Sequence, residues 1–146
     1  MLKKAGIALL GVFIIIQFFR IDKTNPEYNE AEDFITITQP PTEIASLIKL
    51  ACYDCHSHQA KYPWYSNIAP VSWMVANHIK EGRAHLNFST WTTYPEKKAD
   101  HKLEECAEEL EAGDMPMKSY VVMHREAKMT DAQKTALVEW FESQRI

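Results

Sequence analysis

Apolar residues recur with a helical period in several parts of the chain. In the first part the i, i+3, i+4, i+7 series of one helix face is occupied by Ile44, Leu47, Ile48, Ala51, Cys52 and Cys55. Thr42 stands where it can cap this helix, and His56 lies at its C-terminal edge. A second helix is predicted from about Val71 to Arg83, with Trp73, Ala76 and Ile79 on its inner face.

The same period returns in the last third of the chain. Leu103, Cys106, Ala107 and Leu110 predict a third helix, which Gly113 ends. A fourth begins at Thr130, where Thr130 and Gln133 can form a capping box, and presents Ala136, Leu137, Trp140 and Phe141. No alternating pattern typical of strands and no internal repeat is visible. The sequence therefore predicts an all-α domain of about four helices.

The N-terminus carries an uninterrupted apolar run. Residues 5–19 follow Lys3 and Lys4 and contain only Gln17 as a polar break. Bulky Phe18 and Phe19 stand where a cleavage site would need small residues, so residues 1–21 are interpreted as an uncleaved signal-anchor helix. The positive-inside rule then places the rest of the chain on the extracytoplasmic, periplasmic side of the inner membrane.

Between this segment and the predicted helices lies a polar, acidic stretch that ends at Pro40 and Pro41. We expect residues 22–41 to be a tether with little regular structure and residues 42–146 to be the folded domain. Within the domain, residues 85–100 have turn formers and aromatic side chains without a sustained period. They are expected to form a loop.

Charge narrows the classes of partner. The 146 residues carry a formal net charge of −4. Because Lys3, Lys4 and Arg20 belong to the N-terminal segment, the remainder carries −7. Such a surface predicts no nucleic acid as a partner. An acidic helix face from Glu104 to Glu111 is either solvated or steers a basic partner.

The chemistry of the chain is concentrated at "CYDCH", residues 52–56. Two thiols two residues apart can each add to one vinyl group of a porphyrin, and the adjacent His56 can bind its iron, so Cys52, Cys55 and His56 predict one covalent haem c. Zinc is an alternative, with His58, His78 or His85 as further ligands. A redox dithiol is another, although such cysteines usually begin a helix. Cys106 is interpreted as a small core residue.

The sixth iron position needs a ligand from elsewhere in the chain. Met115 is favoured, because Pro116 keeps it extended in the loop after Gly113. Met117 and His78 are the alternatives, and an open position is a third. The other histidines, His58, His85, His101 and His124, are expected to be solvated. An aromatic group is expected to wall the pocket, comprising Tyr62, Trp64, Tyr65, Trp73 and Trp91.

These motifs resemble those of class I cytochromes c, with "CYDCH" at the end of a first helix, "MP" in a late loop and a C-terminal helix after "MTDAQ". More closely, "CHSHQAKYPWYSNIAPVSW", "HIKEGRAHLNFSTW" and "GDMPMKSY" resemble a small bacterial haem-binding domain family, over residues 42–143. The resemblance implies a cytochrome c-like bundle around one haem, attached through Cys52 and Cys55, with His56 proximal and Met115 distal. It also suggests that a proline carbonyl, of Pro63 or Pro70, accepts the proximal imidazole N–H.

Three functions follow from these features. The first is a membrane-anchored monohaem carrier that passes single electrons between unidentified redox partner proteins and is not an enzyme, because a six-coordinate iron leaves no place for substrate. The second is a haem-based sensor or a haem protein reactive toward gases or peroxide, with an open or displaceable sixth position. The third is a zinc-binding interaction module.

Overall fold

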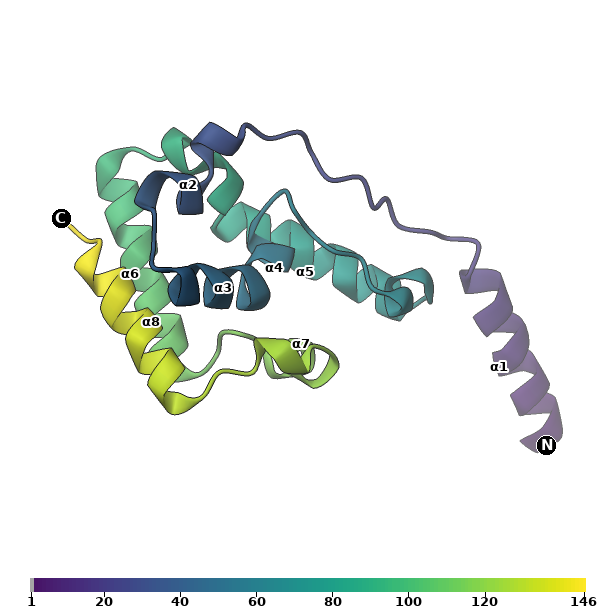
Figure 1. Ribbon diagram of the computed structural model, residues 1–146. Coiled ribbons are helices and arrows are strands. Elements are labelled where there is room, and N and C mark those ends of the chain that lie inside the picture. The colour runs from purple at the N-terminus through teal and green to yellow at the C-terminus, as the bar shows by residue number, and fades with distance from the viewer. Residues whose placement is uncertain (1) are drawn as a thin grey trace.

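The computed structural model describes residues 2–146, and all regular structure in that part of the chain is helical, as predicted (Figure 1). The α-helices are α1 (Leu2–Ile16), α2 (Phe34–Thr38), α3 (Thr42–Ala51), α4 (Tyr53–His56), α5 (Val71–His85), α6 (Glu96–Ala112), α7 (Lys118–Met123) and α8 (Asp131–Ser143). Short 3-10 helices are η1 (Glu30–Glu32), η2 (Trp64–Asn67), η3 (Phe88–Thr93) and η4 (Arg125–Ala127).

The core lies where α3, α6, α8 and η3 meet. Its fully buried large side chains are Phe34, Ile48, Phe88, Leu137 and Phe141. Helices α6 and α8 run side by side in opposite directions (Figure 1). Of the predicted inner face of α8, Leu137 and Phe141 are buried, whereas Ala136 is exposed and Val138 takes its place.

Of the three helix-capping residues or motifs predicted from the sequence, two are present in the structure. Gly113 ends α6 in the left-handed region, with φ 76°. Thr130 and Gln133 form the predicted capping box of α8. The third case is wrong, because Thr42 is the first residue of α3 and Pro41 occupies the N-cap without a side-chain hydrogen bond.

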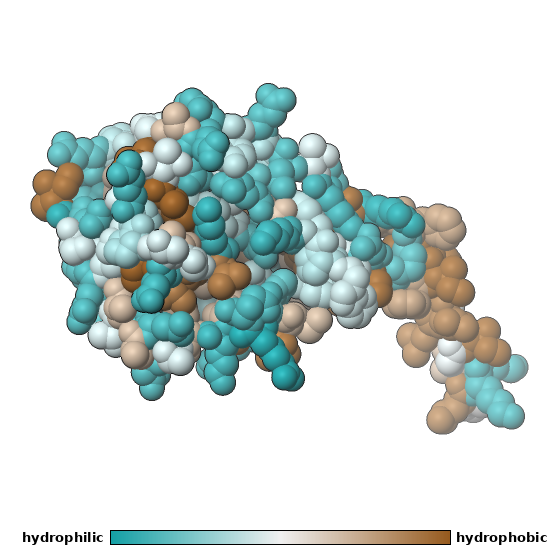
Figure 2. Space-filling view, viewed as in Figure 1, coloured by the Kyte–Doolittle hydropathy of each residue, from teal (hydrophilic) through white to brown (hydrophobic). Residues whose placement is uncertain are grey.

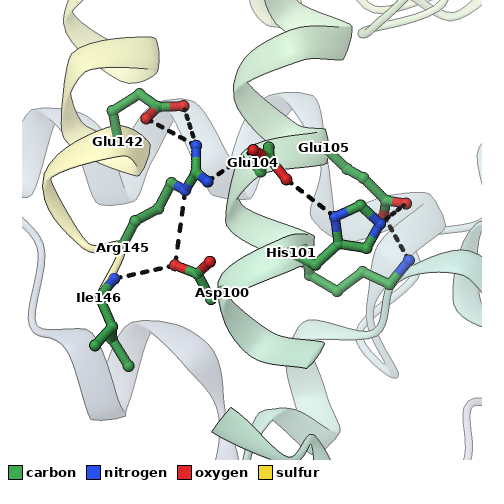
Figure 3. A network of polar contacts seen from close by, with 8 residues as sticks. Asp100, His101, Glu104, Glu105, Glu142, Arg145 and Ile146 are labelled. Atoms are coloured by element: carbon green, nitrogen blue, oxygen red, sulfur yellow. Dashed lines mark hydrogen bonds and ion pairs between the residues drawn. The ribbon is translucent and has the colours of Figure 1, made fainter. Parts of the chain in front are cut away.

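A polar network joins the end of α8 and the residues after it to the first half of α6 (Figure 3). The guanidinium of Arg145 lies 2.7 Å from Glu104, 3.1 Å from Glu142 and 3.6 Å from Asp100. His101 contacts Glu104 and Glu105 on the neighbouring turn. Part of the acidic face of α6 is thus paired within the molecule.

The polar segment before α3 is more ordered than expected. Residues 30–38 form η1 and α2, and Phe34 is fully buried in the core. Asp33 begins α2 by accepting a hydrogen bond from the Ile35 amide, and its carboxylate also accepts the Tyr53 hydroxyl at 2.7 Å. Upstream, Asn25 donates to the Ala60 carbonyl and accepts from Arg83. The segment is therefore attached to the domain at several points.

Residues 85–100, expected to be a loop, contain η3 and the beginning of α6. Phe88 and Trp91 of η3 fill the core, and Pro95 precedes the first residue of α6. Helix α6 therefore starts at Glu96 rather than near Leu103. A single 3-10 segment with an internal kink at Thr90 is too short to produce a repeat that a sequence pattern would reveal.

Helix α1 projects from the domain (Figure 1), and the residues that follow it are hydrogen-bonded to the domain at Ala69 and Trp73. Figure 2 shows hydrophobic side chains over most of its visible surface, and none of its residues is buried. None of the helices in residues 2–146 is both long and apolar enough to cross a membrane.

Candidate functional site

The helix predicted to carry both cysteines is broken between them. Helix α3 ends at Ala51, Cys52 has φ −121° and ψ −40°, and α4 covers Tyr53–His56. Cys52 packs beside the core, whereas Cys55 lines a pocket. All three cysteines of the chain are free thiols. The break therefore keeps Cys52 and Cys55 within one turn of chain while giving their side chains different surroundings.

His56 is held in one orientation by two backbone carbonyls. Its Nδ1 lies 3.0 Å from the Gly82 oxygen and 3.2 Å from the Leu86 oxygen. Both partners can only accept, so the proton is on Nδ1 and Nε2 keeps its lone pair. Burial lowers the pKa of His56, against the raising effect of these two hydrogen bonds, and so favours the neutral imidazole. Neither Pro63 nor Pro70 is the acceptor, so that expectation was wrong.

Gly82 permits this arrangement because α4 and α5 touch there. A Cβ at Gly82 would lie 2.6 Å from the Cys55 carbonyl oxygen and 3.0 Å from its carbonyl carbon. The residue is buried within α5, where glycine is otherwise unfavourable. Because Gly82 has no side chain, α5 can approach α4 closely enough for the Gly82 carbonyl to accept a hydrogen bond from His56.

A pocket of about 360 Å³ lies between α4, η2, α5 and α7. Its wall is mostly apolar and contains Cys55, Pro63, Trp64, Tyr65, Val71, Met74, Val75, His78, Ile79, Met117, Tyr120, Met123 and His124, with Asp54, Lys61 and Ser119. Cys52 and His56 are not part of this wall. The pocket adjoins the motif on the Cys55 side and offers an apolar cavity of the kind that cofactors occupy.

The candidate sixth ligands fall in different places. His78 lines the pocket from α5, and Met117 lines it from just before α7. Met115 is exposed and is not part of the pocket wall. Of the expected aromatic wall, Trp64 and Tyr65 line the pocket, Trp91 lies in the core and Trp73 is exposed.

A polar side of the pocket was not predicted from the sequence. The Tyr65 hydroxyl lies 2.6 Å from Nε2 of His124, whose Nδ1 is 3.2 Å from Glu126. Glu126 fixes the proton on Nδ1, so Nε2 accepts from Tyr65. The Tyr120 ring stacks on His124 with centroids 4.2 Å apart, and its hydroxyl donates to Asp54 at 2.8 Å. His124, expected to be solvated, is therefore part of the pocket.

His58 was also expected to be solvated and instead joins the chain after the motif to the domain. Its Nε2 accepts from Asn87 at 2.8 Å, and its backbone amide donates to Ser89. Arg83 donates to the carbonyl of the preceding Ser57 at 2.7 Å. These contacts, from α5 and η3, fix the backbone that follows His56.

The thiols are partly buried. Burial raises the pKa of Cys52 to about 12, with a smaller effect from Cys55. It raises the pKa of Cys55 to about 11, where the Asp54 carboxylate acts in the same direction. Cys106 packs against the core, and its pKa is likewise raised by burial and by its neighbour Cys52. All three are therefore protonated near neutral pH.

No group of three or more His, Cys, Asp and Glu side chains able to hold a metal ion is found over residues 2–146. The zinc alternative accordingly has no ligand cluster in its support.

The donor set suits a haem. Two free thiols lie within one turn of chain. The imidazole of His56 beside them donates its Nδ1 proton to a backbone carbonyl, which leaves Nε2 available to bind iron. An apolar pocket with further sulfur and nitrogen donors adjoins the motif. These features define an all-helical, haem-binding class of protein.

The comparison with protein families agrees. The model of the haem-binding domain family matches residues 11–143, almost the whole chain. The chain belongs to that family, and its ligand is haem. No curated protein and no solved structure matches it.

Proposed function

We propose that the protein carries one covalently attached haem c and passes single electrons outside the cytoplasm, as a carrier rather than an enzyme. The orientation of His56 carries this proposal. Two carbonyl acceptors on Nδ1 leave Nε2 for iron and raise the basicity of the imidazole. Bound haem supplies a one-electron couple at that position, and the chain supplies its ligands and an apolar surrounding.

Cys52 and Cys55 are proposed as the two attachment points. They have the two-residue separation of the c-type motif, and His56 follows directly. Cys106 lies outside the motif and is proposed to stay a thiol.

For the sixth ligand the pocket favours Met117 over the Met115 predicted from the sequence. Met117 lines the pocket together with Cys55, and Met115, two residues earlier, does not. His78 is the nitrogen alternative on α5. A thioether raises the reduction potential relative to a second imidazole, so the choice affects function.

We further propose that α1 holds the protein at the extracytoplasmic face of the inner membrane. The helix is apolar, with Lys3 and Lys4 at its free end, and basic residues near such a helix favour the cytoplasmic side. Redox partners would then approach the domain from outside the cytoplasm or within the membrane.

Attachment is tested by exporting the full chain in cells that contain haem-ligation machinery. The wild-type protein should keep its haem through extraction with acidified organic solvent, and so should Cys106→Ala. Cys52→Ala combined with Cys55→Ala should release all of it. A wild-type protein whose haem is extracted would disprove covalent attachment.

The sixth ligand is tested by near-infrared spectra of the ferric protein. Met117→Ala should abolish the methionine-to-iron charge-transfer band, and Met115→Ala should keep it. The opposite result restores the sequence-based prediction, and absence of the band in the wild-type protein points to His78 or an open position.

A second function is favoured by the polar side of the pocket. Tyr65 donates its hydroxyl proton to His124, which Glu126 orients, and so presents an oxygen that could accept a hydrogen bond from a protonated small ligand, such as a peroxide, on an open sixth position. This would suit a haem sensor or a protein reactive toward gases or peroxide. Rapid binding of carbon monoxide to the reduced protein would favour it, whereas resistance to carbon monoxide supports the carrier.

A further inference from the structure

One end of the domain has an exposed apolar surface, and the segment that forms it contains no charged residue. Its exposed side chains come from η2 and the beginning of α5, namely Trp64, Ile68, Val71, Trp73 and Met74. Residues 62–79, which contain them, include no Asp, Glu, Lys or Arg, although these make up 25% of the chain. We refer to these five side chains as the 64–74 surface.

The residues that follow α1 are attached beside this surface. The Gln17 side chain donates to the Ala69 carbonyl at 3.0 Å and accepts from the Ala69 amide at 2.9 Å. The Trp73 indole donates to the Phe19 carbonyl at 2.9 Å. Figure 1 shows the end of α1 beside the segment that leads into α5. The apolar helix and the 64–74 surface are thus neighbours.

We propose that the 64–74 surface lies in the interfacial layer of a phospholipid bilayer, the same one into which α1 inserts. The proposal rests on the anchoring proposed above. Tryptophan side chains favour this layer, because the ring is apolar and its N–H can still find a polar partner, which for Trp73 is the Phe19 carbonyl. Absence of charge over residues 62–79 removes the main cost of such contact.

The length of α1 supports the same placement. Its 15 residues extend about 22 Å at 1.5 Å per residue, against a hydrocarbon thickness of about 30 Å. A helix this short draws the domain toward the bilayer. Arg20 and Lys23 lie at the junction between α1 and η2, where lipid phosphates would meet them.

The surface and the haem-site pocket share a rim. Trp64, Val71 and Met74 belong to both. With the 64–74 surface on the bilayer, the pocket lies beside the membrane, and a redox partner that moves in the membrane plane can reach it.

Footprinting of the full chain in vesicles of phosphatidylcholine and phosphatidylglycerol tests the proposal. Met74 and Met123 have similar exposed fractions in the isolated chain, 56% and 49%. With hydroxyl radicals generated by radiolysis, oxidation of Met74 should be about fivefold slower than that of Met123, because lipid covers it. Equal rates in protein that sediments with the vesicles would overturn the proposal and leave the anchoring intact.

A charge placed in the surface provides the matched comparison. Val71→Asp should restore oxidation of Met74, since a carboxylate is expelled from the interface. Leu50→Asp, at a position of nearly equal exposure (40% against 41%), should not. If both variants behave like the wild-type protein, the surface is not in contact with lipid.

Two further outcomes would also contradict the proposal. Protection of Met74 that disappears when the protein is diluted at constant lipid would show that a second copy covers the surface. Failure of the full chain to stay with the vesicles after an alkaline carbonate wash would instead remove the anchoring itself.

Discussion

At Gly82 two helices come so close that no side chain fits between them. A Gly82→Ala substitution sets a methyl group against the Cys55 carbonyl, so α5 must shift and carry the acceptor of His56 with it. We expect a loss of about 1–3 kcal/mol in the free energy of unfolding. Urea denaturation measures it, and haem incorporation should fall in parallel.

Gly11→Ala is the control for this substitution, because a Cβ there meets no atom within 4 Å. It should leave both measurements unchanged. A Gly82→Ala protein as stable as the wild type would show that the helices can separate freely.

The buried carboxylate of Asp33 is stabilised by a hydrogen bond from Tyr53. The Tyr53 hydroxyl donates to it at 2.7 Å, and both residues are buried. Tyr53→Phe removes one donor from a charged acceptor and should cost about 1.5–3 kcal/mol of unfolding free energy. Tyr28→Phe, at an exposed position, should cost almost nothing in the same denaturation experiment. Equal stability of the two variants would contradict the role given to Asp33.

Among the elements, α6 and α8 are joined by an ion-pair network that responds to pH. The pKa of Glu104 is lowered by hydrogen bonds from His101 and then Arg145. A lowered pKa means that the unfolded chain binds the proton more tightly, so the stabilisation is complete above the usual value of 4.5 and is lost below it.

Arg145→Met should therefore lower Tm by no more than a few degrees at pH 7, because the pairs are at the surface. The difference should be smaller at pH 3, because Glu104 takes up its proton as the pH falls below its usual value of 4.5. Thermal unfolding at both pH values measures it, with Arg125→Met as the control for loss of a positive charge. A difference that persists undiminished in acid would assign the effect to packing of the Arg145 side chain.

Long helices were predictable because their apolar faces repeat several times. Leu103, Ala107 and Leu110 identify α6, and Thr130 marks the start of α8. Short elements were missed for the opposite reason. Phe88 and Trp91 lie in one 3-10 segment, and α7 spans only Lys118–Met123, so neither completes a repeat.

The local chemistry of the site was predictable and its long-range contacts were not. Cys52, Cys55 and His56 form a contiguous motif with few alternatives. The acceptor for His56 is a backbone carbonyl 26 positions away, and a carbonyl leaves no trace in the residue type. A single glycine within the apolar pattern of α5 was the available signal, since a helical glycine often marks close packing.

For the whole molecule, the folded domain begins before residue 42, the start predicted from the sequence. Phe34 is fully buried, so a chain that starts at Thr42 lacks a core side chain whose removal alone costs about 3–5 kcal/mol. A chain that starts at Tyr28 retains it. Urea denaturation of the two should differ by at least this amount, and Phe34→Ala in the full chain should reproduce most of the difference. Equal stabilities would place residues 30–38 outside the cooperative unit.

Helix α5 connects two places that the sequence keeps apart. It begins at Val71 in the 64–74 surface, and its last turn holds Gly82 against His56. Helix α5 has 15 residues and is about 22 Å long. A displacement of its first turn can therefore move the Gly82 carbonyl that accepts the hydrogen bond from His56. Under the haem attachment and membrane contact proposed above, a thicker lipid bilayer should change the reduction potential of the full chain, and a potential that does not depend on lipid length would show that α5 transmits no displacement.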